Sequence, residues 1–255
     1  MINRLKQLLI SPYEYAVLYL GLLYFALLCL SWSMVASVLR HLLPDKLGVR
    51  VGQYAIMLGF RLFLFTMRSS GLFKFDLTAL DALRGEPLII TTNHPGLIDV
   101  VLVGSRLPRM VCVLKANLLD NPLLGGGASM AGYIRNDSTG NLIRRSATAI
   151  NEGSQLLIFP EGTRTTTAPI NSFKGGFGLV AKKSGVAIQT AFIETTTPFL
   201  GKGWPLWKKP DFPVTFSVRL GKRYQATHDV TSFVADIETY YRHELKTHPV
   251  FKKKY

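Results

Sequence analysis

The sequence predicts an α/β fold, a mostly parallel sheet flanked by helices, preceded by an N-terminal hydrophobic membrane helix or helix pair. From about Asp76 onward, short apolar runs alternate with stretches of helical periodicity, which is typical of strands and helices around a parallel sheet. Before this region, the run Tyr15–Leu39 contains 25 residues without a formal charge, and a shorter apolar segment, Tyr54–Met67, follows it.

The N-terminal apolar run is long enough to act as a membrane anchor. As a helix, Tyr15–Leu39 would extend about 37 Å, which spans a bilayer and exceeds the core of a signal peptide. The segment Tyr54–Met67 contains Arg61 and is too short to span comfortably, so it fits an interfacial helix, the return arm of a re-entrant pair, or a buried helix of the globular domain. We expect an anchor with interfacial helices over residues 1–70 and a catalytic domain over residues 71–255.

The composition indicates a negatively charged partner. The 255 residues include 30 Lys and Arg against 16 Asp and Glu, a formal net charge of +14, and the mean hydropathy is positive. A basic and hydrophobic chain fits an anionic membrane surface, in a bacterium the cytoplasmic face of the inner (plasma) membrane. Because no nucleic-acid-binding motif is present and the basic residues are scattered, we expect no nucleic-acid partner.

The predicted sheet is built from five short apolar runs. They are Leu88–Thr92, Arg109–Leu114, Gln155–Phe159, Ala187–Phe192 and Val214–Leu220. The stretches Ser146–Gly153 and Phe177–Ser184 fit connecting helices, with Gly153 and Gly185 as C-terminal stops. The tail Thr231–His248 predicts an amphipathic terminal helix, followed by lysines at 252–254.

The segment Thr195–Pro213 interrupts this pattern. It combines prolines, aromatic residues and lysines, namely Pro198, Pro205, Pro210 and Pro213 with Phe199, Trp204, Trp207, Phe212, Lys202, Lys208 and Lys209. Aromatic residues interleaved with lysines can rest at a lipid headgroup boundary. An irregular surface loop whose aromatic residues pack on the domain fits the same sequence.

The stretch Thr91–Asp99 places a histidine and a carboxylate where a buried strand gives way to a helix. Pro95 disfavours the α conformation at His94 and suits a first helical position, so we expect His94 outside the helix and Asp99 one turn inside it. A histidine held there can fold back onto Asp99, which would orient the imidazole and leave its other nitrogen as a general base. A capped helix start with a hydrogen-bonded histidine also fits this spacing.

A second polar turn follows the strand predicted at Gln155–Phe159. Phe159–Arg164 places Glu161, Gly162, Thr163 and Arg164 on one tight turn, where a guanidinium and hydroxyl groups can grip a phosphorylated head group. The same residues could form a solvated turn.

Covalent catalysis has little support in the sequence. Cys29 and Cys112 lie inside apolar runs, as buried or membrane-facing cysteines do, and give no disulfide framework. Ser129 lies in an imperfect nucleophile elbow that lacks its second glycine. His228, His243 and His248 lack the spacing of metal ligands, so we expect no metal site.

Together, the two polar blocks resemble those of the glycerolipid acyltransferase family, the 1-acylglycerol-3-phosphate acyltransferases and their relatives. Asn93-His94-x-x-x-x-Asp99 is similar to the first family block and Phe159–Arg164 to the third, with a similar separation, and the resemblance covers about residues 75–220. Gly132-Tyr133-Ile134-Arg135 resembles the second block, whose arginine binds the acceptor's phosphate.

The chain departs from the family pattern in two places. Lys115, Leu118, Pro122 and Gly125 match the connecting segment, but Asn117 stands where a Glu is usual. In the fourth block, Ala187 and Thr190 stand where proline is common. Because that block helps to shape the acyl or acceptor pocket in the family, this departure concerns the substrate rather than the reaction.

The resemblance implies a membrane-bound O-acyltransferase that moves a fatty acyl group from acyl-CoA or acyl-ACP (acyl carrier protein) to the free hydroxyl of a lysophospholipid, most simply 1-acylglycerol-3-phosphate. It assigns catalysis to His94 and Asp99, and substrate binding to Asn93, Arg135, Glu161, Gly162, Thr163 and Arg164. No cofactor is implied, and membrane lipids are expected partners. Another acceptor, a lyso-aminolipid or a specialised polyene lipid, remains open, as does a non-catalytic membrane-associated adaptor.

Overall fold

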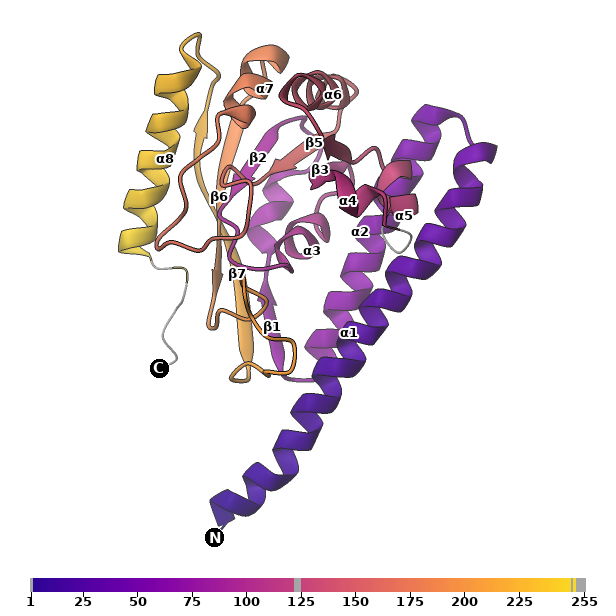
Figure 1. The fold of residues 1–255 in the computed structure, drawn as a ribbon, viewed down its shortest axis with the longest axis vertical. Coiled ribbons are helices and arrows are strands. Elements are labelled where there is room, and N and C mark those ends of the chain that lie inside the picture. Colours follow the sequence, from indigo (N-terminus) through magenta and orange to yellow (C-terminus); the bar gives the residue numbers. More distant parts are fainter. Residues whose placement is uncertain (1, 122–124, 249, 251–255) are drawn as a thin grey trace.

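A seven-stranded sheet forms the centre of the molecule (Figure 1). The computed structural model describes residues 2–121, 125–248 and 250, with side chains from residue 11 onward, so that Pro122 and the lysines at 252–254 lie outside the described residues. The strands are β1 (Phe73–Asp76), β2 (Ile89–Thr92), β3 (Met110–Lys115), β4 (Ile134–Asn136), β5 (Gln155–Ile158), β6 (Ile188–Thr195) and β7 (Val214–Tyr224). Their order in space is β1-β7-β6-β2-β5-β3-β4.

The predicted mostly parallel sheet is confirmed. Only the β6–β7 pair is antiparallel among the described strands, and the central strands β2, β5 and β6 are fully buried, as in sheets covered on both faces. The prediction missed β1 and β4, the two edge strands, because they are three or four residues long and half polar. It also ended β6 and β7 too early, since their long antiparallel pairing runs from Ile188↔Tyr224 to Thr195↔Phe216 and includes polar residues.

Helices cover both faces of the sheet, with α8 on one side and the α1–α2 hairpin on the other (Figure 1). They are α1 (Ile2–Leu42), α2 (Asp45–Ser69), α3 (Asp99–Gly104), α4 (Ala116–Leu119), α5 (Gly125–Met130), α6 (Thr139–Asn151), α7 (Gly176–Ser184) and α8 (Val230–Thr247), with a 3-10 turn at Thr78–Leu83. Helix α6 begins seven residues before the predicted start, because the Ser138 hydroxyl caps it by accepting from the backbone of Asn141.

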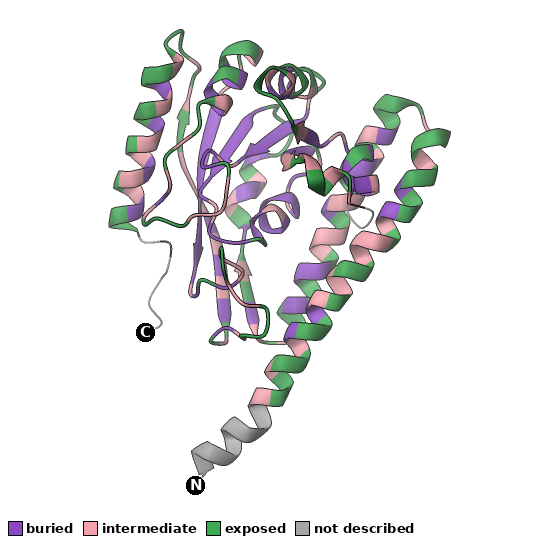
Figure 2. Cartoon of the chain, viewed as in Figure 1, coloured by how far each residue is buried: buried purple, intermediate pink, exposed green. Residues whose placement is uncertain are grey.

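The N-terminal helices form an apolar hairpin. Two helices, at Ser11–Leu42 and Asp45–Ser69, are long and apolar enough to cross a membrane by length and composition. Along α1, exposed apolar residues recur at helical spacing (Leu20, Leu23, Leu27, Met34 and Val38), and α2 carries a similar stripe of Tyr54, Leu58, Leu62 and Phe65 (Figure 2).

The opposite side of α2 packs against the sheet domain. Phe63, Leu64 and Met67 belong to the same hydrophobic core as the strands, and the Gln53 amide donates to Ser154 Oγ at 3.1 Å. The second apolar segment is therefore longer than predicted and combines a buried face with an exposed apolar face. The predicted boundary at residue 70 falls in the turn between α2 and β1, and the division into two domains stays a prediction because the core is continuous across it.

Candidate active site

The chain after β2 brings His94 and Asp99 together. His94 Nδ1 lies 2.7 Å from Asp99 Oδ2, and the backbone N–H of Gly96 donates to the same oxygen at 2.9 Å. The helix begins later than predicted, since Asp99 is the first residue of α3 and residues 95–98 form a turn instead of a helical turn started by Pro95. This turn is what folds the imidazole back onto the carboxylate.

Asp99 is buried, and its polar contacts are made by the oxygen that faces the imidazole. Burial raises the pKa of Asp99, and the hydrogen bonds from His94 and Gly96 oppose that rise. Asp99 Oδ1 has no hydrogen-bond partner within the described part of the chain, so Oδ2 makes its polar contacts. In the tautomer whose Nδ1 donates to Asp99, Nε2 is the nitrogen that can accept a proton.

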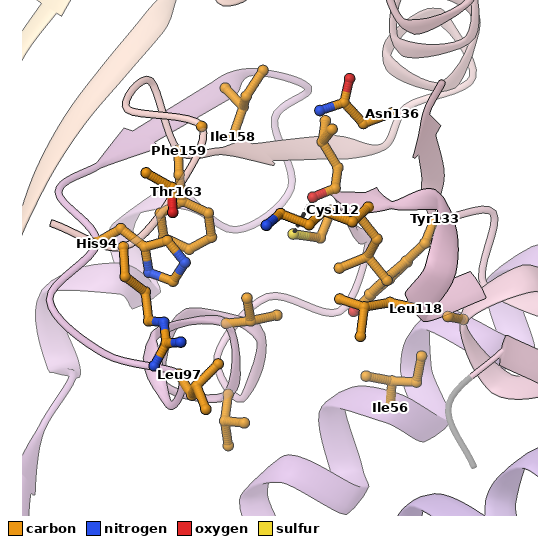
Figure 3. A pocket seen from close by; sticks show the side chains of 18 of the residues that line it. Ile56, His94, Leu97, Cys112, Leu118, Tyr133, Asn136, Ile158, Phe159 and Thr163 are labelled. Carbon is orange, nitrogen blue, oxygen red and sulfur yellow. Dashed lines mark hydrogen bonds between the residues drawn. The ribbon is translucent and has the colours of Figure 1, made fainter. Parts of the chain in front are cut away.

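A ring contact fixes the plane of the imidazole. The rings of His94 and Phe159 stack with centroids 3.8 Å apart and planes 16° apart. Figure 3 shows the two rings side by side at the edge of the cavity. The first residue of the second polar block thus supports the histidine of the first.

Glu161 links the same two blocks through the backbone. Its Oε1 accepts from the His94 N–H at 3.0 Å and from the Thr165 hydroxyl at 2.8 Å, while Oε2 accepts from the Asn171 N–H at 2.9 Å. The Thr165 N–H in turn donates to the His94 carbonyl at 2.8 Å. Burial raises the pKa of Glu161, against the hydrogen bonds that it accepts. The carboxylate is buried, and its contacts position His94.

Asn93 also makes internal contacts. Its side-chain amide donates to the Ile193 carbonyl at 2.9 Å and its oxygen accepts from the Ile193 N–H at 2.8 Å, so a fully buried Asn93 fastens the end of β2 to β6. Neither Asn93 nor Glu161 lines the cavity beside His94. Their contacts position the chain around His94, and their role in substrate binding stays a prediction.

Gly162, Thr163 and Arg164 do line that cavity. Gly162 has a φ of +66°, which glycine adopts without strain, and its Cα faces the side chain of Lys174. Arg164 Nη1 donates to the Leu200 and Gly201 carbonyls at 3.0 and 2.9 Å, so the segment between β6 and β7 holds the guanidinium in place.

Arg135 is not brought to the cavity. Its guanidinium makes a two-pronged ion pair with Asp120, at 2.8 and 2.9 Å. Side chains alternate along a strand, and the next residue of β4, Asn136, lines the cavity instead. Since β4 is a three-residue edge strand, the sequence offered no periodicity that could decide which of the two residues faces inward.

A cavity of about 1050 Å³ opens between the catalytic turn and the helical hairpin. Its apolar wall includes Phe25, Leu28, Trp32, Ile56, Phe60, Leu97, Val101, Leu118, Tyr133 and Leu142, and both cysteines, Cys29 and Cys112, lie on it. Polar and basic groups line other parts: Lys115, Asn117, Asn136, Thr139, Thr163, Arg164, Lys174 and Lys202. Figure 3 shows His94 and Thr163 across the cavity from Tyr133 and Leu118. A mostly apolar cavity with a few polar groups fits an amphipathic ligand.

Lys174 and Lys202 were missed by the sequence analysis as site residues. Lys174 lies in an irregular segment before α7, and Lys202 in the segment that we had interpreted as a surface or headgroup loop. The tertiary fold alone brings both to the cavity of His94.

The comparisons with known proteins agree with these two blocks. The family model described as Acyltransferase matches residues 74–194. Residues 74–194 form a domain of the acyltransferase family. This stretch runs from β1 through β6 and includes His94, Asp99 and Phe159–Arg164. The resemblance stated from the sequence is therefore confirmed, and the non-catalytic adaptor has no support from it.

Relatives of this acyltransferase domain include enzymes with different acceptors. The chain is 32% identical over 128 residues to the lyso-ornithine lipid O-acyltransferase of Pseudomonas aeruginosa, an alignment that covers 46% of this chain and 49% of that protein. It is 28% identical over 123 residues to a chloroplastic 1-acyl-sn-glycerol-3-phosphate acyltransferase of Arabidopsis thaliana, covering 46% and 35%. The chain thus spans half or less of the length of these two relatives.

Two further matches extend over most of the chain. A 1-acyl-sn-glycerol-3-phosphate acyltransferase of Pseudomonas aeruginosa is 20% identical over 212 residues, covering 81% of this chain and 79% of that protein. The crystal structure of the 1-acyl-sn-glycerophosphate acyltransferase PlsC from Thermotoga maritima superimposes with a TM-score of 0.66 at 14% identity, covering 98% and 99% of the two chains. This match shows that the two chains share a fold over almost their whole lengths.

Proposed function

We propose that this protein transfers a fatty acyl group from a thioester donor, acyl-CoA or acyl carrier protein, to the free hydroxyl of a lysophospholipid. His94 Nε2 removes the hydroxyl proton as the oxygen attacks the thioester carbonyl carbon. The tetrahedral intermediate then collapses, the C–S bond breaks, and the thiolate leaves and takes up a proton. Acceptor and donor meet directly, so no covalent acyl-enzyme is needed.

The observation that carries this proposal is the His94–Asp99 contact at the edge of an apolar cavity. The buried carboxylate holds the imidazole by Nδ1 at 2.7 Å, which is the arrangement of an oriented general base. The cavity beside it is large enough for an acyl chain and is lined mainly by apolar side chains of α1, α2 and β3. A base next to an apolar cavity suits a substrate with a hydroxyl near its polar end.

Three basic residues favour an acceptor with a negatively charged head group. Arg164, Lys174 and Lys202 line the same cavity as His94. Phosphate is recognised by such groups through charge-assisted hydrogen bonds. We therefore infer that 1-acylglycerol-3-phosphate is the acceptor and phosphatidic acid the product, and that these three side chains hold the phosphate while the hydroxyl faces His94.

The packing of α2 supports attachment along one membrane surface rather than a crossing. Contacts with the sheet domain extend from Gln53, in the first half of α2, to Met67, near its end. A helix covered by a polar domain over this length cannot also be surrounded by lipid. The exposed stripes of α1 and α2 can instead rest in one leaflet, on the cytoplasmic side where anionic lipids and thioester donors meet.

The test is acyl transfer by the His94→Ala variant. Thiol release from acyl-CoA and from acyl carrier protein would be followed with 1-acylglycerol-3-phosphate as acceptor, with His228→Ala, an exposed histidine, as the matched control. We expect His94→Ala to lose about 10²–10⁴-fold in rate, and His228→Ala to retain the wild-type rate. Near-normal turnover by a folded His94→Ala protein would remove the proposed mechanism.

A second acceptor is favoured by one comparison and one contact. The lyso-ornithine lipid O-acyltransferase matches the chain at 32% identity, and Arg135, the arginine expected to bind phosphate, is paired with Asp120. We propose a lyso-aminolipid as the alternative acceptor. Competition between 1-acylglycerol-3-phosphate and a lyso-ornithine lipid for a limiting donor separates the two, because the preferred acceptor suppresses product from the other.

A further inference from the structure

The segment between β6 and β7 exposes two adjacent large apolar side chains. Leu206 and Trp207 are 58% and 76% exposed at its tip. The tip is a formed turn, since the Lys208 N–H donates to the Pro205 carbonyl at 3.0 Å and Trp204 Nε1 donates to the Lys208 carbonyl at 2.9 Å. Side chains held outward in this way leave apolar surface in water without a partner from the described part of the chain, which is typical of an interaction site.

The base of the segment is anchored, so the exposure is confined to the tip. Trp204 packs edge-on against Phe199, with ring centroids 6.0 Å apart. Phe199 is buried and contacts Phe73 of β1 in the hydrophobic core. The surface-loop alternative for Thr195–Pro213, in which the aromatic residues pack on the domain, therefore describes Trp204 and Phe199. It does not describe Trp207, which is exposed.

The tip also lies beside the start of the uncharged apolar run of α1, at Glu14 and Tyr15. Lys209 forms an ion pair with Glu14 and lies over the ring of Tyr15, 5.4 Å from its centroid. Three exposed tyrosines, Tyr13, Tyr15 and Tyr19, lie on this part of α1. Tryptophan and tyrosine prefer the interface between hydrocarbon and water, so the turn continues an aromatic group at the end of the α1 apolar stripe.

Positive charge accompanies the exposed apolar pair. Lys202 and Lys208 are exposed on the same segment, and Lys208 Nζ lies 5.1 Å from the Trp204 ring centroid. A lysine ammonium beside exposed apolar side chains suits lipid phosphates. The formal net charge of +14 favours an anionic surface for the whole chain.

We propose that the turn Pro205–Lys208 is a second membrane contact that extends the one made by the α1–α2 hairpin. Leu206 and Trp207 enter the headgroup region of an anionic bilayer, and Lys208 binds a lipid phosphate. This contact also reaches the active site, because the Leu200 carbonyl of the same segment accepts from the Leu97 N–H at 3.1 Å and from Arg164 at 3.0 Å. Docking of the turn would fix the catalytic turn at a defined distance from the lipid.

The test uses the fluorescence of Trp207 in the full chain. Wild type and Trp207→Phe would be reconstituted in phosphatidylglycerol vesicles and in phosphatidylcholine vesicles, and the difference between their emissions isolates Trp207 from Trp32 and Trp204. In phosphatidylglycerol we expect a blue-shifted difference spectrum that lipids brominated close to the headgroup quench and aqueous iodide does not. This readout is independent of acyl transfer.

Charge variants sharpen the outcome. Lys208→Glu is expected to decrease brominated-lipid quenching of Trp207 several-fold, whereas Lys183→Glu, an equal charge change at an exposed position on α7, leaves it unchanged. Trp207 emission that stays iodide-accessible in both kinds of vesicle would overturn the proposal. So would protection from iodide that appears only when an acidic acyl carrier protein is added, because the turn would then dock a protein.

Discussion

Glu161 Oε1 lies 3.0 Å from the backbone nitrogen of His94, although the two residues are 67 positions apart in the chain. The carboxylate thus joins the two strand ends that form the site, at the edge where β2 and β5 run parallel. Because the other Glu161 oxygen accepts from Asn171, one buried group holds three backbone segments in register. These contacts give Glu161 a positioning role beside His94.

Glu161→Gln is expected to impair catalysis without removing the base. The amide keeps one acceptor oxygen but turns an NH₂ group toward a backbone N–H, which leaves donors unpaired and costs about 1–3 kcal/mol of unfolding free energy. Steady-state kinetics should show a lower kcat with KM nearly unchanged. In a His94→Ala background the substitution should add no further loss of rate, whereas an additive loss would indicate that Glu161 acts on the substrate itself. Glu152→Gln, at an exposed position, is the control.

How much of this site could be predicted from the sequence depends on how far apart in the chain the contacting residues lie. The pairing of His94 with Asp99 could be predicted because the short turn between them sets it, even though the helix starts later than expected. The direction in which the Arg135 side chain points could not be predicted, because it depends on which side of a short edge strand faces the cavity. Lys174 and Lys202 reach the site only through the tertiary packing of irregular segments, where no period indicates a direction.

Asp99→Asn is expected to reduce the rate by about 10²–10⁴-fold while leaving the fold intact. An amide of the same shape fills the site but removes the charge that favours a proton on Nδ1 and a transient positive imidazole. Rates would be measured by thiol release, and folding by circular dichroism in detergent. Asp236→Asn, an exposed residue of α8, serves as the control. A variant with more than a tenth of wild-type activity would show that orientation by Asp99 is dispensable.

The comparison of wild type with Asp99→Asn also tests how stability depends on pH. Because burial raises the pKa of Asp99, the folded state holds this proton more tightly than the unfolded state. Wild type therefore loses unfolding free energy as pH rises from the ordinary aspartate range through the raised pKa, and no more above it. Asp99→Asn lacks this loss, so its melting temperature relative to wild type should increase with pH across that window. A relative melting temperature that falls over the same range would contradict the direction of the shift.

Gly162 and Lys174 are expected to be coupled. A Cβ at Gly162 would lie 2.9–3.0 Å from the side-chain end of Lys174, and the φ of +66° disfavours any other residue. Gly162→Ala should therefore cost about 1–2 kcal/mol for the left-handed backbone, and it should displace the Lys174 ammonium and raise KM for the acceptor. In a Lys174→Ala background the KM effect should disappear while the backbone cost remains. An unchanged KM effect in that background would place the cause elsewhere.

The hairpin is expected to be held to the domain by close backbone approach at Gly52. A Cβ at Gly52 would lie 2.7 Å from the Ala131 backbone nitrogen, and backbone cannot swing aside as a flexible side chain can. Gly52→Ala should therefore destabilise by about 1–3 kcal/mol through overpacking, despite the better helix propensity of alanine. Gly140→Ala on α6 has nothing within 4 Å of the new Cβ and should be neutral or slightly stabilising. Thermal melts in detergent compare the two, and a Gly52→Ala protein as stable as Gly140→Ala would mean that α2 can separate from α5. Since Ile56 and Phe60, farther along α2, line the cavity, the same separation should also weaken lysophospholipid binding, measurable as a higher KM.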